Sequence, residues 1–258
     1  MKRKLSLMLV LLFLVVTLVT PTTTLAGMID NGTYPMGDLS PCELTATYLL
    51  PIGTVIVMSP NSATVIKGAA AENLVKTNQV TTVVMAGMGS SSQGTAAFAK
   101  HVAIATGVPV AGVVTGLGDG TAYTEGAQGY FIGRTANFYG YYYPEIASDK
   151  LASLYVAGAR PEKLIGHSKG NLDVVNTLYK LKQEGRQSMY QGVRVITFGC
   201  GVNIPTGVGT FEQYMGTIDS VGIFNTVSYY NLTWVTGKDH TINPAIYATY
   251  LPVMDYVN

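Results

Sequence analysis

Gly166-His167-Ser168-Lys169-Gly170 is the most informative segment of the sequence, because it sets a serine between two glycines at fixed spacing. Residues 163–165 before it form a short apolar run, and residues 171–184 after it carry apolar side chains at helical spacing. A sharp turn from a strand into a helix needs small flanking residues, because side chains there would collide with the neighbouring strand and helix. The sequence therefore predicts that Ser168 stands in such a turn, with its hydroxyl lifted clear of a sheet.

Apolar runs alternate with segments of helical periodicity on both sides of this turn. Residues 45–58 and 63–67 are rich in β-branched side chains and are expected to form the first strands, as a hairpin. Continuous apolar strands that alternate with amphipathic helices predict an α/β fold, with a mainly parallel central sheet and helices on both faces. Further strands are expected at residues 81–86, 109–115, 163–165, 193–198 and 227–235, and helices at 95–106, 146–159 and 171–184.

Residues 116–144 depart from this alternation, since they interleave glycines with aromatic residues and show no clear period. A segment of this length without regular structure is uncommon in a compact domain unless it has a function. It is expected to form a lid or an aromatic wall over a substrate cleft. The alternative is a loop that packs on the core through its tyrosines.

Residues 1–26 have the three parts of a secretory signal peptide. A positive segment at residues 2–4 precedes an apolar run at residues 5–19, and the small-residue site Thr24-Leu25-Ala26 follows. Cleavage is expected after Ala26, which leaves residues 27–258 as a single domain. The alternative is an uncleaved membrane anchor, for which the apolar run is short. The mature protein is expected to be secreted by a bacterium and to have no membrane span.

Composition argues against several classes of function. The formal net charge is +1 and charged residues make up 12% of the chain, whereas nucleic-acid binding needs a clustered basic surface. Three scattered histidines and two distant cysteines do not form a zinc site, and residues 116–120 lack the spacing of a dinucleotide-binding loop. Neither a metal nor a cofactor is expected. Cys42 and Cys200 form a disulfide, which export permits, or Cys200 is a buried thiol.

A serine hydroxyl needs a base to accept its proton, and histidine suits that role because its pKa lies close to neutral. The glycine-flanked serine turn is typical of α/β-hydrolases, in which the order along the chain is serine, acid, histidine. His240 satisfies this order, because it follows the last expected strand. His101 precedes the serine, and the side chain of His167 is expected to point away from its neighbour. Ser168 is therefore the predicted nucleophile, and His240 is its predicted base.

The acid that orients the imidazole should lie between Ser168 and His240 in the sequence. Asp219 is preferred, because it occupies a turn-like segment before the last expected strand. Asp239 is the alternative, although neighbouring side chains on a loop rarely meet in the required geometry. Three other carboxylates are expected on helices and away from the site: Asp173, which should face solvent, Glu184 and Glu212.

The reaction also needs two backbone N–H groups that stabilise the negative oxygen of the intermediate. One is expected from Lys169, the residue after the serine, whose side chain should reach solvent. The other is expected from residues 87–91, Gly-Met-Gly-Ser-Ser, which follow the strand at 81–86. The glycines let the backbone approach a bound carbonyl, and Met88 is the predicted donor.

Residues 166–171, Gly-His-Ser-Lys-Gly-Asn, resemble the serine turn of lipase-like α/β-hydrolases, especially the fungal-type (class 3) lipases and their bacterial relatives. Residues 195–199 resemble the Thr-Phe-Gly strand that follows the serine helix in that group. With residues 219–221 and His240, the resemblance covers residues 80–245. It implies the α/β-hydrolase fold and a serine esterase or lipase without a cofactor. Cys200-Gly201 stands where that group usually has a proline, and this departure concerns the substrate more than the reaction.

These patterns predict a secreted serine hydrolase that cleaves carboxylic esters through an acyl-enzyme intermediate. The substrate stays open among lipids, short soluble esters and polyesters such as polyhydroxyalkanoate. An acyltransferase or a peptidase could use the same scaffold, because fold and catalytic residues do not fix the acyl acceptor. The alternative outside enzymes is an exported binding protein with a degenerate site, which is favoured if His240 lies far from Ser168.

Overall fold

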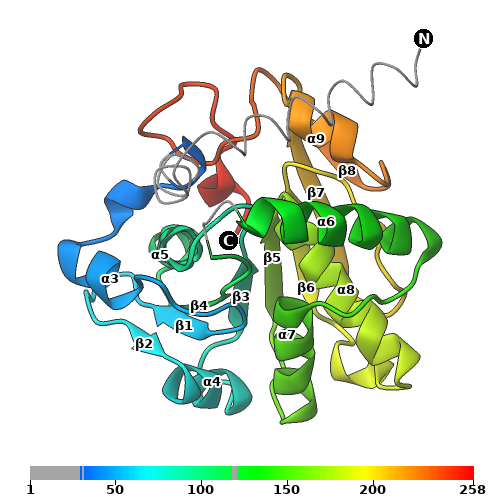
Figure 1. Cartoon of the computed structure of the whole chain (residues 1–258), viewed down its shortest axis with the longest axis horizontal. Helices are drawn as coiled ribbons and strands as arrows, with labels where there is room; N and C mark the ends of the chain where they lie inside the picture. The colour runs from blue at the N-terminus through cyan, green and yellow to red at the C-terminus, as the bar shows by residue number, and fades with distance from the viewer. Residues whose placement is uncertain (1–29, 31, 118–120) are drawn as a thin grey trace.

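The computed structural model describes residues 30, 32–117 and 121–258 (Figure 1). The predicted signal peptide, residues 1–26, lies outside the described residues. Within the described ranges the chain forms an eight-stranded sheet with helices on both faces, so the predicted α/β class is confirmed. The strands are β1 (Val55–Met58), β2 (Ile66–Lys67), β3 (Thr82–Met85), β4 (Val110–Val113), β5 (Lys163–His167), β6 (Arg194–Phe198), β7 (Thr210–Gly216) and β8 (Leu232–Val235).

Each strand from β3 to β5 is followed by one or two helices, whereas β6 leads directly into β7. The α-helices are α3 (Pro41–Ala46), α4 (Ala69–Lys76), α5 (Ser92–Thr106), α6 (Thr121–Tyr139), α7 (Ile146–Val156), α8 (Lys169–Gln183) and α9 (Ser220–Asn225). Short 3-10 helices are η1 (Met36–Asp38), η2 (Gln187–Met189) and η3 (Val253–Asp255).

The strands lie in the order β2-β1-β4-β3-β5-β6-β7-β8. All neighbours from β4 to β8 run parallel, whereas β1 is antiparallel to both β2 and β4. The antiparallel β1–β2 pair confirms the predicted hairpin. Parallel strands end on the same edge of a sheet, so the loops that follow β3, β5 and β6 meet there.

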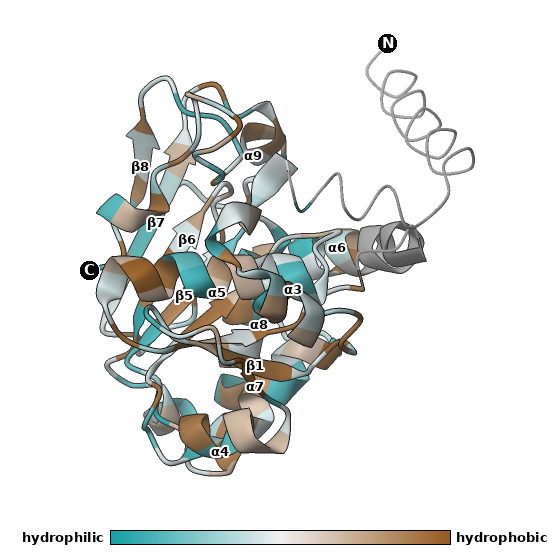
Figure 2. Ribbon diagram, turned by 90° about the vertical axis from the view of Figure 1, so that its left-hand side faces the viewer, coloured by the Kyte–Doolittle hydropathy of each residue, from teal (hydrophilic) through white to brown (hydrophobic). Residues whose placement is uncertain are grey.

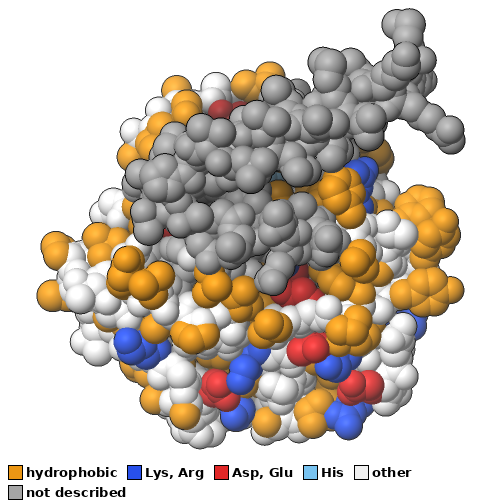
Figure 3. All heavy atoms as spheres, viewed as in Figure 1, with side chains coloured by type: hydrophobic (Ala, Val, Ile, Leu, Met, Phe, Trp, Pro, Cys, Tyr) orange, Lys and Arg blue, Asp and Glu red, His pale blue; other side chains and the backbone are white. Residues whose placement is uncertain are grey.

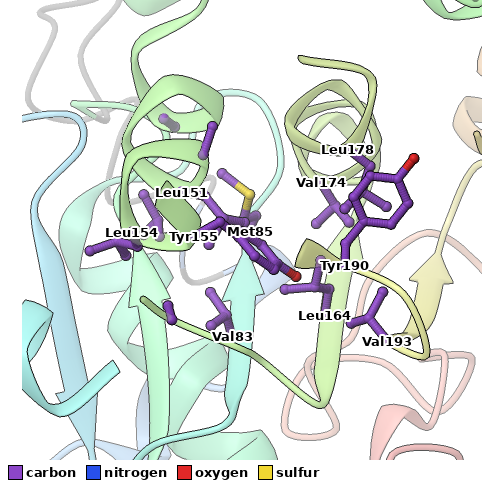
Figure 4. Close-up of a cluster of buried hydrophobic side chains, with 14 of the residues drawn as sticks. Val83, Met85, Leu151, Leu154, Tyr155, Leu164, Val174, Leu178, Tyr190 and Val193 are labelled. Carbon is purple, nitrogen blue, oxygen red and sulfur yellow. The ribbon is translucent and has the colours of Figure 1, made fainter. Parts of the chain in front are cut away.

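Successive residues of a strand face opposite sides of the sheet, and here they enter two separate cores. Leu164 of β5 belongs to the core with α4, α7 and α8 on one side, and Figure 4 shows it near side chains of β3, α7 and α8. Ile165 packs with α5 and the carboxyl-terminal segment on the other side. All residues of β1 are buried, and Figure 2 shows this strand in hydrophobic colours. Full burial of one such side chain contributes about 1.5–3 kcal/mol.

Residues 116–144 contain the helix α6, so the expectation of a segment without regular structure is wrong. Glycines within the helix hid its period, and at least one of them is required by packing. A Cβ atom on Gly133 would lie 2.4 Å from the Tyr143 hydroxyl oxygen. The carboxyl end of α6 is held by Asn137, whose amide nitrogen donates to the carbonyl oxygen of Asn203 over 2.8 Å. Movement of this segment as a lid stays a prediction.

The strand β7 replaces the short helix that was expected around Glu212. Its apolar pattern is weak, because polar side chains of this strand make contacts within the sheet. The Glu212 carboxylate accepts from the Arg194 guanidinium of neighbouring β6 over 2.8 Å. Gln213 is buried, accepts from the backbone N–H of Val202 over 2.7 Å and donates to the carbonyl oxygen of Tyr230 over 2.5 Å.

The first strand is shorter than the predicted range of residues 45–58. Ser40 and Glu43 form a capping box that starts α3, so residues 41–46 are helical. Strand structure is confined to Val55–Met58.

Hydrophobic side chains are exposed near the carboxyl end of α6. Figure 3 has the view of Figure 1 and shows such side chains at the right-hand edge, where α6 lies in Figure 1. Charged side chains lie mostly toward the lower half of the same face. No helix among the described residues is both long and apolar enough to cross a membrane. The exposed hydrophobic residues on α6 and just after its carboxyl end are Phe131, Ile132, Phe138, Tyr139 and Tyr141.

Candidate active site

Ser168 stands between the end of β5 and the start of α8, as the glycine pattern predicts. Its φ of 55° and ψ of −125° lie in a region that residues with a side chain rarely adopt, so its backbone is strained. Both flanking glycines are required by close packing. A Cβ atom on Gly166 would lie 2.7 Å from the Asn171 Cα, and one on Gly170 would lie 2.1 Å from the Met85 carbonyl oxygen. The turn therefore holds the serine in one backbone conformation.

The loop at residues 87–91 approaches Ser168 directly. A Cβ atom on Gly87 would lie 2.9 Å from the Cβ atom of Ser168. The N–H of Lys169 belongs to the first residue of α8 and so has no acceptor within the helix. Met88 is partly buried beside the core of α4, α7 and α8. The roles of these two amides as oxyanion donors stay predictions.

His240 and Asp219 lie in contact, with 2.8 Å between the imidazole Nδ1 and the carboxylate Oδ2. Asp219 is buried and precedes α9, where its Oδ1 accepts from the N–H of Gly222 over 2.5 Å. One carboxylate oxygen is thus fixed by the backbone and the other faces the imidazole. A Cβ atom on Gly222 would lie 2.5 Å from the Asp219 Oδ2, so glycine is needed beside this pair.

Asp239, the alternative acid, has both oxygens engaged elsewhere. Its Oδ1 accepts from the N–H of Thr241 over 2.9 Å, and its Oδ2 accepts from the Thr249 hydroxyl over 2.6 Å. These contacts lie within the loop that carries His240, and the carboxylate that contacts the imidazole is that of Asp219.

Ser168 and His240 each lie against the end of β6. The N–H of Ser168 donates to the carbonyl oxygen of Phe198 over 2.9 Å. A Cβ atom on the next residue, Gly199, would lie 2.9 Å from the Cε1 atom of His240. The serine and the imidazole therefore lie against the same turn, although within the described residues they share no hydrogen bond. Such contacts are often long in enzymes without bound substrate.

The other two histidines are buried and have partners of their own. His101 on α5 contacts the Asp38 carboxylate through its Nδ1 at 2.7 Å. His167 is completely buried, with its Nδ1 3.1 Å from the Tyr34 hydroxyl and its Nε2 2.9 Å from the backbone oxygen of His240. Burial lowers the pKa of His167 to about 3, with a smaller effect from nearby His240. His167 is therefore neutral at ordinary pH.

Lys169 and Asp173 were expected at the surface, and the structure shows that this is wrong. Both are buried, and the Lys169 ammonium lies 2.7 Å from the Asp173 carboxylate and 3.5 Å from that of Glu145. Burial raises the pKa of Asp173 to about 7. The Lys169 ammonium offsets part of the cost of burying the two carboxylates. The i,i+4 spacing on α8 is compatible with the Lys169–Asp173 pair, but Glu145 lies in another segment, so local spacing gave no sign that the pair is buried.

Cys42 and Cys200 are both free, so the disulfide alternative is wrong and Cys200 is a buried thiol. Its Sγ donates to the carbonyl oxygen of Ser168 over 3.2 Å. Burial raises its pKa to about 12, so this thiol stays protonated. The side-chain amide of Asn171 donates to the carbonyl oxygens of Phe198 and Cys200, over 2.9 and 2.8 Å. Cys200 and Asn171 together hold the turn that Ser168 and His240 share.

Tyr34 is a residue of the site that the sequence did not single out. It is buried, and its hydroxyl accepts from the N–H of Gly87 over 2.5 Å. Its partner Gly87 lies 53 residues further along the chain, so no local pattern marks it. Among the described residues, no group of three or more His, Cys, Asp or Glu side chains is placed to hold a metal ion.

No protein-family model and no curated protein matches this chain. A solved structure of a hormone-sensitive lipase from a metagenome library is similar at 12% identity over 68% of this chain and 74% of that one, with a TM-score of 0.44. A solved structure of an arylesterase is similar at 11% identity over 77% of this chain and 81% of that one, with a TM-score of 0.38.

Proposed function

We propose that this chain is a serine hydrolase that cleaves carboxylic esters, with Ser168 as nucleophile, His240 as base and Asp219 as the acid that orients the base. The observation that carries the proposal is the 2.8 Å contact between Asp219 and His240 beside a serine with a φ of 55°. A carboxylate on Nδ1 keeps the proton there and leaves Nε2 free to accept another. A strained strand-to-helix turn is how α/β-hydrolases present their serine.

The reaction proceeds in two halves. The Ser168 oxygen attacks the ester carbonyl carbon while the His240 Nε2 takes the hydroxyl proton, and a tetrahedral intermediate forms. The intermediate collapses, the carbon–oxygen bond to the alcohol breaks, and His240 returns the proton to the departing alcohol. Water then attacks the acyl-enzyme, with His240 again accepting and returning a proton, and releases the acid. Asp219 stabilises the imidazolium that exists between these transfers.

The negative oxygen of the intermediate is stabilised by the N–H groups of Lys169 and Met88 in this proposal. The Lys169 amide has no acceptor within α8, and the 87–91 loop runs within van der Waals distance of Ser168. Each such donor contributes about 2.7–4 kcal/mol to transition-state stabilisation in enzymes of this type.

We further propose that the chain is exported from a bacterium through residues 1–26 and acts on an apolar ester. The exposed hydrophobic side chains at the end of α6 support an apolar substrate. Lipids, short soluble esters and polyesters all fit this chemistry, and a series of p-nitrophenyl esters of increasing acyl length would separate them.

The proposal is tested by reacting the mature chain with a fluorophosphonate probe and mapping the modified peptide by mass spectrometry. We expect modification at Ser168, loss of modification in Ser168→Ala and at least a thousandfold slower modification in His240→Ala. Ser153→Ala is the matched control, because Ser153 is exposed on α7 and its hydroxyl donates to the Lys150 carbonyl oxygen. Modification of another serine, or unchanged ester hydrolysis in Ser168→Ala, would refute the proposal.

A further inference from the structure

A chain of hydrogen bonds runs beneath Ser168 and links the two loops on either side of it. The N–H of Gly87 lies 2.5 Å from the Tyr34 hydroxyl, which lies 3.1 Å from the His167 Nδ1. The His167 Nε2 lies 2.9 Å from the backbone carbonyl oxygen of His240. We name this connection the Tyr34–His167 bridge. It joins the predicted oxyanion loop, the residue before the predicted nucleophile and the main chain of the predicted base.

The ends of the bridge fix the direction of each hydrogen bond. The N–H of Gly87 can only donate, and the carbonyl oxygen of His240 can only accept. His167 must therefore carry its proton on Nε2, and its Nδ1 accepts the proton of the Tyr34 hydroxyl. All of these donors and acceptors are satisfied by a neutral imidazole in a single tautomer.

The surroundings keep this tautomer. Tyr34 and His167 are buried, and the ring of Phe98 lies against both, with centroids 5.9 and 6.3 Å away. The burial that lowers the pKa of His167 to about 3 excludes a second ring proton near neutral pH. His240 acts electrostatically on His167, and Asp30 acts on Tyr34.

The segment that carries Tyr34 also holds both loops through its backbone. The N–H of Ile242 donates to the carbonyl oxygen of Thr33 over 3.0 Å, and the Thr241 hydroxyl donates to that of Gly32 over 2.7 Å. On the other side, the Ser91 hydroxyl donates to the Asp30 carboxylate over 2.5 Å. The segment at residues 30 and 32–34 therefore connects the loop of His240 with the loop at residues 87–91 through hydrogen bonds.

We propose that Tyr34 and His167 are positioning residues for catalysis, which hold the main chain of His240 and the 87–91 loop in register with Ser168. The inference rests on the proposed function. His240 shares no hydrogen bond with Ser168 among the described residues, so the distance between base and nucleophile is set by what holds the backbone of His240. A displacement of about 1 Å in such a group can cost about a hundredfold in rate.

The first test is Tyr34→Phe, which removes one oxygen and leaves the ring in place. We expect kcat for p-nitrophenyl esters to fall about tenfold to a hundredfold, with KM unchanged within about twofold, because substrate binding is not altered. Tyr155→Phe is the matched control, since the Tyr155 hydroxyl is buried and has no hydrogen-bond partner in the described part of the chain. Equal kcat values in wild type, Tyr34→Phe and Tyr155→Phe would overturn the inference.

The second test compares two substitutions at His167. Gln places an amide nitrogen near the position of Nε2 and can still donate to the His240 carbonyl oxygen, whereas Leu can donate nothing. We expect His167→Gln to keep at least tenfold more kcat than His167→Leu at equal thermal stability. Equal losses in the two variants would indicate a packing role only, and would overturn the positioning role.

A third measurement needs no enzymatic activity, and so separates this inference from the proposed function. Nitrogen-15 NMR of the mature chain should show His167 protonated on Nε2 alone, with constant shifts between pH 5 and 8. Tyr34→Phe should change those shifts and Tyr155→Phe should not. Protonation on Nδ1, or titration within this range, would overturn the bridge. If Ser168 does not react with fluorophosphonate while the NMR result holds, the proposed function fails and the bridge remains as structure without its catalytic role.

Discussion

The middle of β5 consists of buried apolar side chains, whereas its carboxyl end consists of a glycine and a strained backbone turn. In the middle, Leu164 and Ile165 are completely buried and each fills one of the two cores. At the end, Gly166 has no side chain because Asn171 occupies that space, and Ser168 takes a strained conformation. The neighbouring β6 repeats the contrast, with Val195 and Ile196 in the cores and a glycine at residue 199 against the His240 imidazole.

The middle of the strands provides stability, whereas the strand ends hold the residues of the candidate site. Apolar burial in the middle of the strands provides free energy of folding in proportion to the area removed from water. At the strand ends that area is given up, so that backbone segments and polar side chains can approach one another closely. Substitutions in the middle of the strands should therefore lower the free energy of unfolding and leave kcat unchanged, whereas substitutions at the strand ends should lower kcat.

The largest effect is expected from Asp219→Asn at the end of β7. Asn cannot accept the Nδ1 proton of His240 through its NH₂ group, and the imidazole is then held in the wrong tautomer. We expect kcat to fall about 10⁴-fold, as known for such a change in a serine protease. The Oδ1 contact to Gly222 can persist, so the melting temperature should change little.

Asp239→Asn is the matched control for this change. Its carboxylate contacts Thr241 and Thr249 and not the imidazole, so kcat should fall less than tenfold. If Asp239→Asn were the more damaging variant in the same assay, the assignment of Asp219 as the acid would be wrong.

The second effect is expected from Leu164→Ala in the middle of β5. Removal of a fully buried leucine side chain typically costs about 2–5 kcal/mol of unfolding free energy, measured by urea denaturation. The value of kcat at 25 °C should stay within about twofold of wild type. Val156→Ala at the exposed end of α7 is the control, and should change stability by less than about 0.5 kcal/mol. A loss of kcat without loss of stability in Leu164→Ala would contradict the separation of middle and end.

Strands with continuous apolar runs could be predicted from the sequence. A strand whose polar side chains contact neighbouring strands could not. The strands β3, β5 and β6 were predicted because their residues are apolar on both faces. The strand β7 was missed because Glu212 and Gln213 owe their places to partners on other segments. Helix α6 was missed because its glycines hid its period, and one of them, Gly133, is required by the packing of Tyr143, which follows the helix.

In the candidate site too, residues marked by a local pattern were predicted, and residues held by distant segments were not. The glycine-flanked serine was predicted because steric exclusion leaves a fixed local pattern. Local spacing pairs Lys169 with Asp173 on α8 but could not predict that both are buried, because their neighbour Glu145 lies in another segment. The same applies to Tyr34, whose partners Gly87 and His167 lie far along the chain, and no local pattern marks it.

A third effect, at the boundary of the two regions, is expected from Gly170→Ala. The new Cβ would lie 2.1 Å from the Met85 carbonyl oxygen, which is backbone and cannot rotate away. We expect a loss of about 1–3 kcal/mol in unfolding free energy, together with a fall in kcat, because the start of α8 must shift beside Ser168. Gly37→Ala is the control, since a Cβ there meets no atom within 4 Å. Wild-type stability and kcat in Gly170→Ala would show that the turn tolerates displacement.

The smallest effect concerns the pH dependence of stability at His167. Its folded pKa is about 3, below the 6.5 of an ordinary histidine, so below pH 6.5 the unfolded chain binds a proton that the folded chain does not. The stability that neutral His167 contributes is complete above pH 6.5 and is lost as the pH falls toward 3. The difference in unfolding free energy between wild type and His167→Gln should therefore shift against wild type by about 1.4 kcal/mol between pH 7.5 and 5.5. The penalty of Leu164→Ala involves no proton and should stay constant over this range. A pH-independent difference for His167→Gln would mean that water reaches the imidazole, and that the end of β5 is less tightly closed than its middle.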